Sequence, residues 1–259
     1  MGSPHPSPTI EFSQVAYRLG NGRELLHGLN LAVEPGETLV LLGRSGSGKT
    51  TTLKLINRLL IASDGDVRVE GRSTKAWNVI GLRRRIGYAI QDVGLFPHFT
   101  VERNIALVPT IEGWQAARIR DRVRELMHLV GLDPEAGPRY PHELSGGQRQ
   151  RVGVARALAA DPPILLMDEP FGALDPITRS QLQREFKELQ RRLRKTVVFV
   201  THDLREALLL ASRIGLMEDG RLVTLLSPQA FTASSEELVQ SYLQAFGSEG
   251  GLAGKGEQA

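Results

Sequence analysis

One short segment constrains the fold of this chain more than any other: the glycine-rich run Gly43–Thr50, which reads GRSGSGKT. It follows the apolar stretch Thr38–Leu42, which predicts a buried strand, and it leads into residues 49–60, whose apolar spacing predicts a helix. This strand–loop–helix context is the one that the pattern G-x-x-x-x-G-K-[ST] requires. Glycines allow backbone N–H groups to close around phosphates, and Lys49 adds a positive charge toward the β and γ positions. The segment therefore predicts a nucleoside triphosphate site on an α/β fold, rather than an ordinary Gly/Ser turn.

Predicted strands and helices alternate on both sides of a long helical block. Further elements are predicted at 67–69, 86–90, 164–167 and 197–201 (strands) and at 177–194 and from 204 onward (helices). Between residues 101 and 160 the strand signals disappear and helical spacing dominates, as over 116–130 and 148–160. Apolar strands that alternate with helices form parallel sheets covered on both faces. We therefore predict a mostly parallel α/β core into which a helical block, about 92–160, is inserted.

Two acids end one of these strands. The apolar run Ile164–Met167 leads directly into Asp168 and Glu169. In α/β sheets ligands lie at the carboxyl ends of strands, so both carboxylates are expected beside the phosphate loop. We predict that Asp168 and the Thr50 hydroxyl serve the Mg²⁺ shell and that Glu169 polarises the attacking water. The alternative is a solvent-exposed strand end, which the presence of the phosphate loop disfavours.

A second phosphate-seeking element lies far downstream of the first. The run Leu144–Gln150 (LSGGQRQ) introduces the helix predicted over 148–160. A helix N-terminus carries unpaired N–H groups and the positive end of the helix dipole, and it attracts phosphate. Two such elements in one short chain suggest a single composite site, which two copies of the chain could build together.

Charge and composition exclude several classes of protein. The formal net charge is only +3, too small to indicate nucleic acid or anionic lipid as a partner, and the absence of cysteine excludes disulfides and thiolate metal sites. The apolar runs, such as Val197–Val200, are far shorter than the roughly 20 residues of a transmembrane helix. The N-terminus has no basic and apolar signal regions, so we expect a disordered leader over 1–8 and a flexible tail over 247–259.

Taken together, these motifs resemble those of the ATP-binding subunit of ABC transporters, over residues 9–246. The resemblance implies a P-loop NTPase fold of the ABC ATPase type, with a mostly parallel core sheet, N-terminal antiparallel strands and an inserted helical subdomain. It divides the chain into a core, about 9–91 and 161–246, and a helical subdomain, about 92–160. The implied activity is ATP hydrolysis, with ATP and Mg²⁺ bound.

The resemblance also implies roles for single residues. Tyr17 matches the aromatic residue that stacks on adenine, Gln91 the glutamine that contacts Mg²⁺ and relays ATP occupancy, and His202 the histidine at the γ-phosphate. Ala173–Asp175 matches the loop that passes between two subunits. The residues implied to bind ATP in their own chain are Tyr17, Gly43, Arg44, Ser45, Gly46, Ser47, Gly48, Lys49, Thr50 and Thr51. Those implied to meet the ATP of a partner subunit are Ser145, Gly146, Gly147, Gln148 and Asp175. The implied catalytic set is Glu169, His202 and Gln91, and the Mg²⁺ set is Thr50, Gln91 and, through water, Asp168.

The kind of transporter is indicated by the segment Ile86–Val101 together with Asn104–Ala106 and Gly113–Trp114. These residues resemble the subfamily that imports osmoprotectants such as glycine betaine, carnitine and choline. The implied partners are a second copy of the chain, paired head to tail around ATP, transmembrane permease subunits and, indirectly, a solute-binding protein, with no nucleic acid. The implied location is the cytoplasmic face of the plasma or inner membrane, held peripherally through the permease.

Several alternatives share parts of this pattern. An importer of another solute, or an exporter, carries the same catalytic motifs, so the sequence leaves the transported substrate open. A chromosome-maintenance or DNA-repair ATPase would place a long coiled coil between the two half-sites, whereas only a short helical block separates Gln91 from Ser145. A regulatory module without hydrolysis would not need the complete catalytic set.

Overall fold

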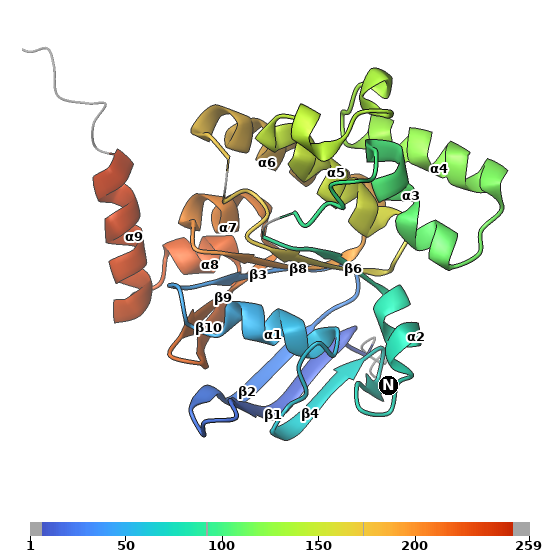
Figure 1. Ribbon diagram of the computed structural model, residues 1–259. Coiled ribbons are helices and arrows are strands. Elements are labelled where there is room, and N and C mark those ends of the chain that lie inside the picture. Colours follow the sequence, from blue (N-terminus) through green and yellow to red (C-terminus); the bar gives the residue numbers. More distant parts are fainter. Residues whose placement is uncertain (1–6, 92, 173, 251–259) are drawn as a thin grey trace, which may run out of the picture.

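The computed structural model describes residues 7–91, 93–172 and 174–250, and its elements form two sheets and surrounding helices (Figure 1). The strands are β1 (Ile10–Arg18), β2 (Glu24–Val33), β3 (Thr38–Leu42), β4 (Asp64–Val69), β5 (Arg72–Ser73), β6 (Ile86–Ala89), β7 (Ile164–Asp168), β8 (Thr196–Thr201), β9 (Arg213–Glu218) and β10 (Arg221–Leu226). The helices are α1 (Lys49–Ile56), α2 (Val79–Arg84), α3 (Val101–Ile111), α4 (Ala116–Leu129), α5 (Gly146–Leu158), α6 (Pro176–Leu193), α7 (Leu204–Leu210), α8 (Pro228–Thr232) and α9 (Glu237–Gly250), with short 3₁₀ turns at Pro134–Ala136 and Pro141–Glu143.

The order of the strands confirms the predicted fold class. The larger sheet has the order β10-β9-β3-β8-β7-β6, and its strands pair in parallel except for β10 with β9. The smaller sheet, β2-β1-β4-β5, is antiparallel and comes from the N-terminal part of the chain. Parallel pairing brings the carboxyl ends of β3, β7 and β8 to one edge of the larger sheet.

Two hydrophobic clusters cover the two faces of the larger sheet. Successive side chains of a strand point to opposite faces, so Leu39 and Leu41 join one cluster while Val40 and Leu42 join the other. The first of these clusters includes residues of α1, which lies between the two sheets (Figure 1). The second includes residues of α3 to α7. Because β3 is buried on both faces, the phosphate loop that follows it starts from a rigid position.

The predicted helical block is present as α3, α4 and α5, which pack on one another above the larger sheet (Figure 1). Helix α5 also packs directly on β6, and a Cβ at Gly87 would lie 2.2 Å from the Ala157 carbonyl oxygen. This close approach ties the helical block to the core. The division of the chain at about residues 92 and 160 stays a prediction, and residue 92 lies outside the described residues.

Two helix ends differ from the sequence predictions. Helix α1 ends at Ile56 rather than near residue 60, because Asn57 is its C-cap and Arg58 adopts a left-handed conformation with φ of 53°. Helix α9 continues to Gly250, past the predicted domain end at residue 246, and the flexible tail over 247–259 stays a prediction. Fully buried Val239 anchors α9 to the core. Residues 251–259 and 1–6 lie outside the description, and none of the described helices is long and apolar enough to cross a membrane.

Candidate nucleotide site

The phosphate loop connects the buried end of β3 to the start of α1. Gly48 precedes α1 with φ of +99°, in the left-handed region that favours glycine, and a Cβ there would lie 2.6 Å from the Leu26 side chain. A Cβ at Gly43 would lie 2.3 Å from the Met217 carbonyl oxygen. Both ends of the loop therefore approach neighbouring chain segments too closely for any side chain.

Lys49 lies at the centre of this loop. Its side chain is buried, and Nζ donates hydrogen bonds to the carbonyl oxygens of Gly43 and Arg44, both at 2.7 Å. Burial lowers the pKa of the Lys49 ammonium, while the carboxylates of Glu169 and Asp168 act in the opposite direction. The loop thus holds a cation where a bound triphosphate would place its charge.

The loop forms one wall of a cleft of about 890 Å³, a size suited to a nucleotide. Its lining residues are Leu19, Arg23, Leu25, Gly43, Arg44, Ser45, Gly46, Gly48, Lys49, Thr50, Thr51, Gln91, Glu169, His202 and Tyr242. The structure therefore brings Gln91, Glu169 and His202, from three separate segments, to the phosphate loop. Ser47 is buried beneath the loop, and its hydroxyl lies 3.4 Å from Lys49 Nζ.

Asp168 reaches the same cleft through Thr50. The Thr50 hydroxyl donates to Asp168 Oδ1 at 2.9 Å, and the Tyr88 hydroxyl donates to Oδ2 at 3.2 Å. Burial raises the pKa of Asp168, and these two hydrogen bonds oppose that rise; burial also raises the pKa of Tyr88. No sequence pattern indicated this role of Tyr88, because its contact with Asp168 depends on β6 pairing with β7.

These oxygen atoms fit Mg²⁺. The Thr50 hydroxyl, the Asp168 carboxylate and the Gln91 amide are ligands of the kind that this ion prefers. Within the described residues, no group of three or more His, Cys, Asp and Glu side chains could hold a metal ion alone. Phosphate oxygens and water would therefore fill the remaining coordination positions of an ion at Thr50 and Asp168, as is usual for Mg²⁺.

Glu169 and His202 form a pair at the carboxyl edge of the sheet. His202 Nδ1 lies 3.1 Å from Glu169 Oε2. The Glu169 N–H donates to the Val200 carbonyl oxygen at 3.0 Å, which extends the pairing of β7 and β8 by one residue. Glu169 adopts φ of +44°, an uncommon conformation for a residue other than glycine, and such strain is concentrated at functional sites.

The lining of the cleft differs from the sequence predictions at two tyrosines. Tyr17 does not line it; the ring is half-buried and packs against the cluster between the sheets. Leu19 and Leu25, from the same β1–β2 hairpin, line the cleft instead, and a role of Tyr17 toward adenine stays a prediction. Tyr242 of α9 also lines the cleft, and no sequence signal near it pointed to a nucleotide site.

The second phosphate-seeking element lies outside this cleft. Ser145 caps α5: its hydroxyl accepts from the Gln148 N–H at 3.2 Å, and the Gln148 side chain accepts from the Ser145 N–H at 2.9 Å. A Cβ at Gly147 would lie 2.7 Å from Thr178 Cγ2, so the start of α5 packs closely on the start of α6. Asp175 caps α6 and accepts from the Thr178 N–H. None of the residues implied to meet a partner's ATP lines the cleft of its own chain. Ala173 of the neighbouring loop lies outside the described residues.

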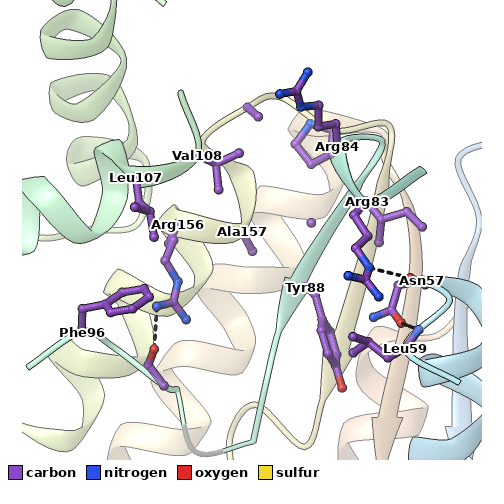
Figure 2. Close-up of a pocket in the computed structure, with 15 residues that line it drawn as sticks. Asn57, Leu59, Arg83, Arg84, Tyr88, Phe96, Leu107, Val108, Arg156 and Ala157 are labelled. Carbon is purple, nitrogen blue, oxygen red and sulfur yellow. Dashed lines mark hydrogen bonds between the residues drawn. The ribbon is translucent and has the colours of Figure 1, made fainter. Parts of the chain in front are cut away.

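A separate groove of about 380 Å³ is lined by residues of the α1–β4 connection, α2, β6, α3 and α5 and of neighbouring connections (Figure 2). Tyr88 and Leu59 stand on one side of it, and Phe96 and Arg156 stand on the other (Figure 2). Arg156 donates to the Gly94 carbonyl oxygen at 2.7 Å and thereby fixes the chain that follows Gln91. Tyr88 donates to Asp168, which also accepts from Thr50 of the nucleotide cleft, so hydrogen bonds connect this groove to that cleft.

The parallel sheet, the phosphate loop after β3 and the acids at the end of β7 define the class as P-loop nucleotide-binding proteins. Residues 26–172 match the family described as ABC transporter. The chain belongs to that family.

Relatives agree with this assignment. The chain is 48% identical to the glycine betaine/carnitine/choline transport ATP-binding protein OpuCA of Bacillus subtilis, over 90% of this chain and 62% of the relative. It is 55% identical to the glycine betaine uptake system ATP-binding protein YehX of Escherichia coli, over 83% of this chain and 69% of the relative. The chain thus spans only about three fifths of the Bacillus relative's length. Among solved structures, the ATP-binding cassette MJ0796, a dimer bound to ADP and Pi, superposes with a TM-score of 0.75 at 33% identity, covering 85% of this chain and 98% of that one.

Proposed function

We propose that this chain is the ATP-binding and ATP-hydrolysing subunit that powers a membrane importer, and that the imported solute is an osmoprotectant such as glycine betaine, carnitine or choline. One observation carries the enzymatic part: Lys49, the Thr50–Asp168 pair and the Glu169–His202 pair all meet at a single cleft. Binding, charge neutralisation and activation of water are the three tasks that phosphoryl transfer to water requires.

Each residue has a task set by its position. The phosphate loop and Lys49 bind the triphosphate, and Thr50, Gln91 and Asp168 would hold Mg²⁺, which neutralises charge on the phosphate oxygens. Glu169 accepts the proton of the attacking water, a contribution of about 10²- to 10⁴-fold for a well-placed general base. His202, 3.1 Å from Glu169, donates to the γ-phosphate.

The complete site needs two copies of the chain. The phosphate loop covers one side of the triphosphate, and the Ser145–Gln148 start of α5 from a partner would cover the other with its N–H groups. This arrangement follows from the separation of the two elements within one chain and from the dimeric cassette MJ0796. ATP would then join the two copies, and hydrolysis would release them.

We further propose that the groove in Figure 2 receives a cytoplasmic segment of the permease. The groove is connected to the nucleotide cleft: Tyr88 lines the groove and donates to Asp168, which also accepts from Thr50 of the cleft. A partner in the groove would therefore contact a side chain coupled to the nucleotide site. This docking would hold the chain at the cytoplasmic face of the membrane. The transported solute is inferred from the names of the relatives, since the subunit does not contact it.

The function is tested on the complex of this chain with its permease. ATP hydrolysis by that complex in lipid vesicles should rise when a solute-binding protein loaded with glycine betaine, carnitine or choline is added, because transport and hydrolysis are coupled. Phosphate release is the measurement, and the binding protein without solute is the control. Stimulation by an unrelated solute alone would contradict the proposed substrate class, and absence of hydrolysis would contradict the enzyme.

Leu59→Asp should release the permease while leaving ATP hydrolysis by the isolated subunit unchanged. Leu59 lines the groove and is 48% exposed, so the substitution does not disturb the core, but a docked partner would have to bury the new carboxylate. We expect permease binding to weaken at least about tenfold, which affinity purification measures. Ile61→Asp is the matched control, because Ile61 is 56% exposed and does not line the groove. Equal permease binding by both variants would place the docking surface elsewhere.

A further inference from the structure

A buried carboxylate lies behind His202 and has no place in the site described so far. Glu206 of α7 is only 3% exposed. Its Oε1 accepts a hydrogen bond from Gln183 Nε2 at 2.9 Å, and its Oε2 accepts one from the Thr201 hydroxyl. Both oxygens are therefore bound to groups on other elements, Gln183 on α6 and Thr201 at the end of β8.

Burying a carboxylate lowers the stability of the fold, because the charged group loses its contacts with water. A hydrophobic residue of similar size would pack here without this desolvation cost. Burial raises the pKa of Glu206, and the hydrogen bonds from Thr201 and Gln183 together with the charge of Arg179 act against the rise. The side chain is thus held in one position by directional contacts. Directional contacts of this kind define geometry more strictly than apolar packing does.

The geometry that Glu206 defines is that of the backbone around His202. Thr201 directly precedes His202, and its hydroxyl, besides donating to Glu206, accepts from the Asp203 N–H at 3.0 Å. Glu206 therefore holds Thr201 directly, and through the Thr201 hydroxyl it also orients Asp203, so the residues before and after His202 are linked to it. The His202 side chain is 59% exposed, so packing alone does not fix its position.

Helix α6 supports the same region from the other side through Arg179. One guanidinium nitrogen of Arg179 donates to the carbonyl oxygens of Gly172 and Leu174, both at 3.2 Å. Another lies 3.8 Å from the carboxylate of Asp203. Arg179 therefore joins the loop that follows Glu169 to the residue that follows His202.

We propose that Glu206 is a positioning residue for His202, and that through Gln183 and Arg179 it makes α6 the common support of His202 and Glu169. The N-cap of α6 is Asp175, which the proposed function places toward a partner subunit. A shift of α6 caused by pairing of the subunits would therefore move the His202 segment relative to Glu169. The inference rests on the proposed ATPase function, and it adds a route by which dimer formation switches hydrolysis on.

Glu206→Ala tests the inference in the full chain. We expect kcat for ATP hydrolysis to fall about 10- to 100-fold, the loss expected when a reacting group is misplaced by about 1 Å. The KM for ATP should stay close to the wild-type value, because the phosphate loop does not contact Glu206. Glu206→Gln should recover most of the activity, since an amide of the same size can accept from Gln183 and donate to Thr201.

A double-mutant cycle separates positioning from general stability. If Glu206 acts through His202, Glu206→Ala should cause no further loss of kcat in a His202→Ala background, because coupled residues are not additive. Additive losses would overturn the inference, as would unchanged kcat in Glu206→Ala. If Glu206→Ala does not fold, Thr201→Val is the second variant, because it removes only the bridging hydroxyl. The control is Glu188→Ala, on the exposed face of α6. If His202→Ala alone leaves hydrolysis unchanged, this inference fails while the ATPase function stands; if the wild-type chain hydrolyses no ATP, the proposed function fails.

Discussion

Glu169→Gln is expected to bind ATP as the wild type does, to hydrolyse it about 10²- to 10⁴-fold more slowly and to accumulate as an ATP-bound dimer. A glutamine preserves the size of the side chain and its contact with His202, but it cannot take a proton from water. The phosphate loop and Lys49 lie on the other wall of the cleft and are unchanged. Because ATP in the proposed dimer joins the two copies and is no longer consumed, the dimer should persist. Gel filtration with Mg-ATP and a phosphate-release assay measure the two effects.

The control for this prediction is Glu125→Gln, on the exposed face of α4 and away from the cleft. It should hydrolyse ATP at the wild-type rate and should not accumulate as a dimer. Unchanged turnover in Glu169→Gln would show that another group activates the water. A variant that binds Mg-ATP but stays monomeric would contradict the role of ATP in joining the two copies.

The features that the sequence predicted well are those in which a few consecutive residues determine both structure and chemistry. The phosphate loop requires glycine at Gly43 and Gly48 because neighbouring atoms leave no room for a Cβ, so the motif is visible without the fold. Asp168 and Glu169 could be placed beside the phosphate loop because ligands bind at the carboxyl ends of parallel strands. Local sequence and local geometry coincide at these positions.

The features that the sequence did not reveal depend on which elements become neighbours. Tyr88 contacts Asp168 only because β6 pairs with β7, and Glu206 reaches Gln183 only because α7 packs on α6. Tyr242 lines the cleft because α9 is held to the core by buried residues far from any motif. A strand order and a helix packing are sums of many weak contacts, so no short pattern encodes them.

The proposed composite site predicts the second large effect, which concerns subunits that are defective in different halves. Lys49→Ala removes the cation of the phosphate loop, and Ser145→Arg places a bulky side chain where α5 would meet the partner's ATP. Each variant alone should lose nearly all hydrolysis, because both sites of its homodimer are damaged. In a mixed dimer, one site combines both defects, while the other combines the intact phosphate loop of one chain with the intact Ser145 of its partner. Mixing the two inactive variants should therefore restore hydrolysis at no more than one of the two sites.

Phosphate release, measured for each variant and for the mixture, distinguishes this arrangement from a site within one chain. If each chain formed its own complete site, Ser145→Arg would stay active alone and mixing would restore nothing. Full wild-type activity of the mixture would equally contradict the composite site.

Ser145→Arg also removes the cap of α5, which costs about 0.5–2 kcal/mol of stability. Ser227→Arg removes the corresponding cap of α8, where the Ser227 hydroxyl accepts from the Ala230 N–H at 3.2 Å. Because Ser227 lies outside both halves of the site, Ser227→Arg should stay active although it loses a helix cap. The inactivity of Ser145→Arg can then be assigned to the blocked contact between α5 and the partner's ATP.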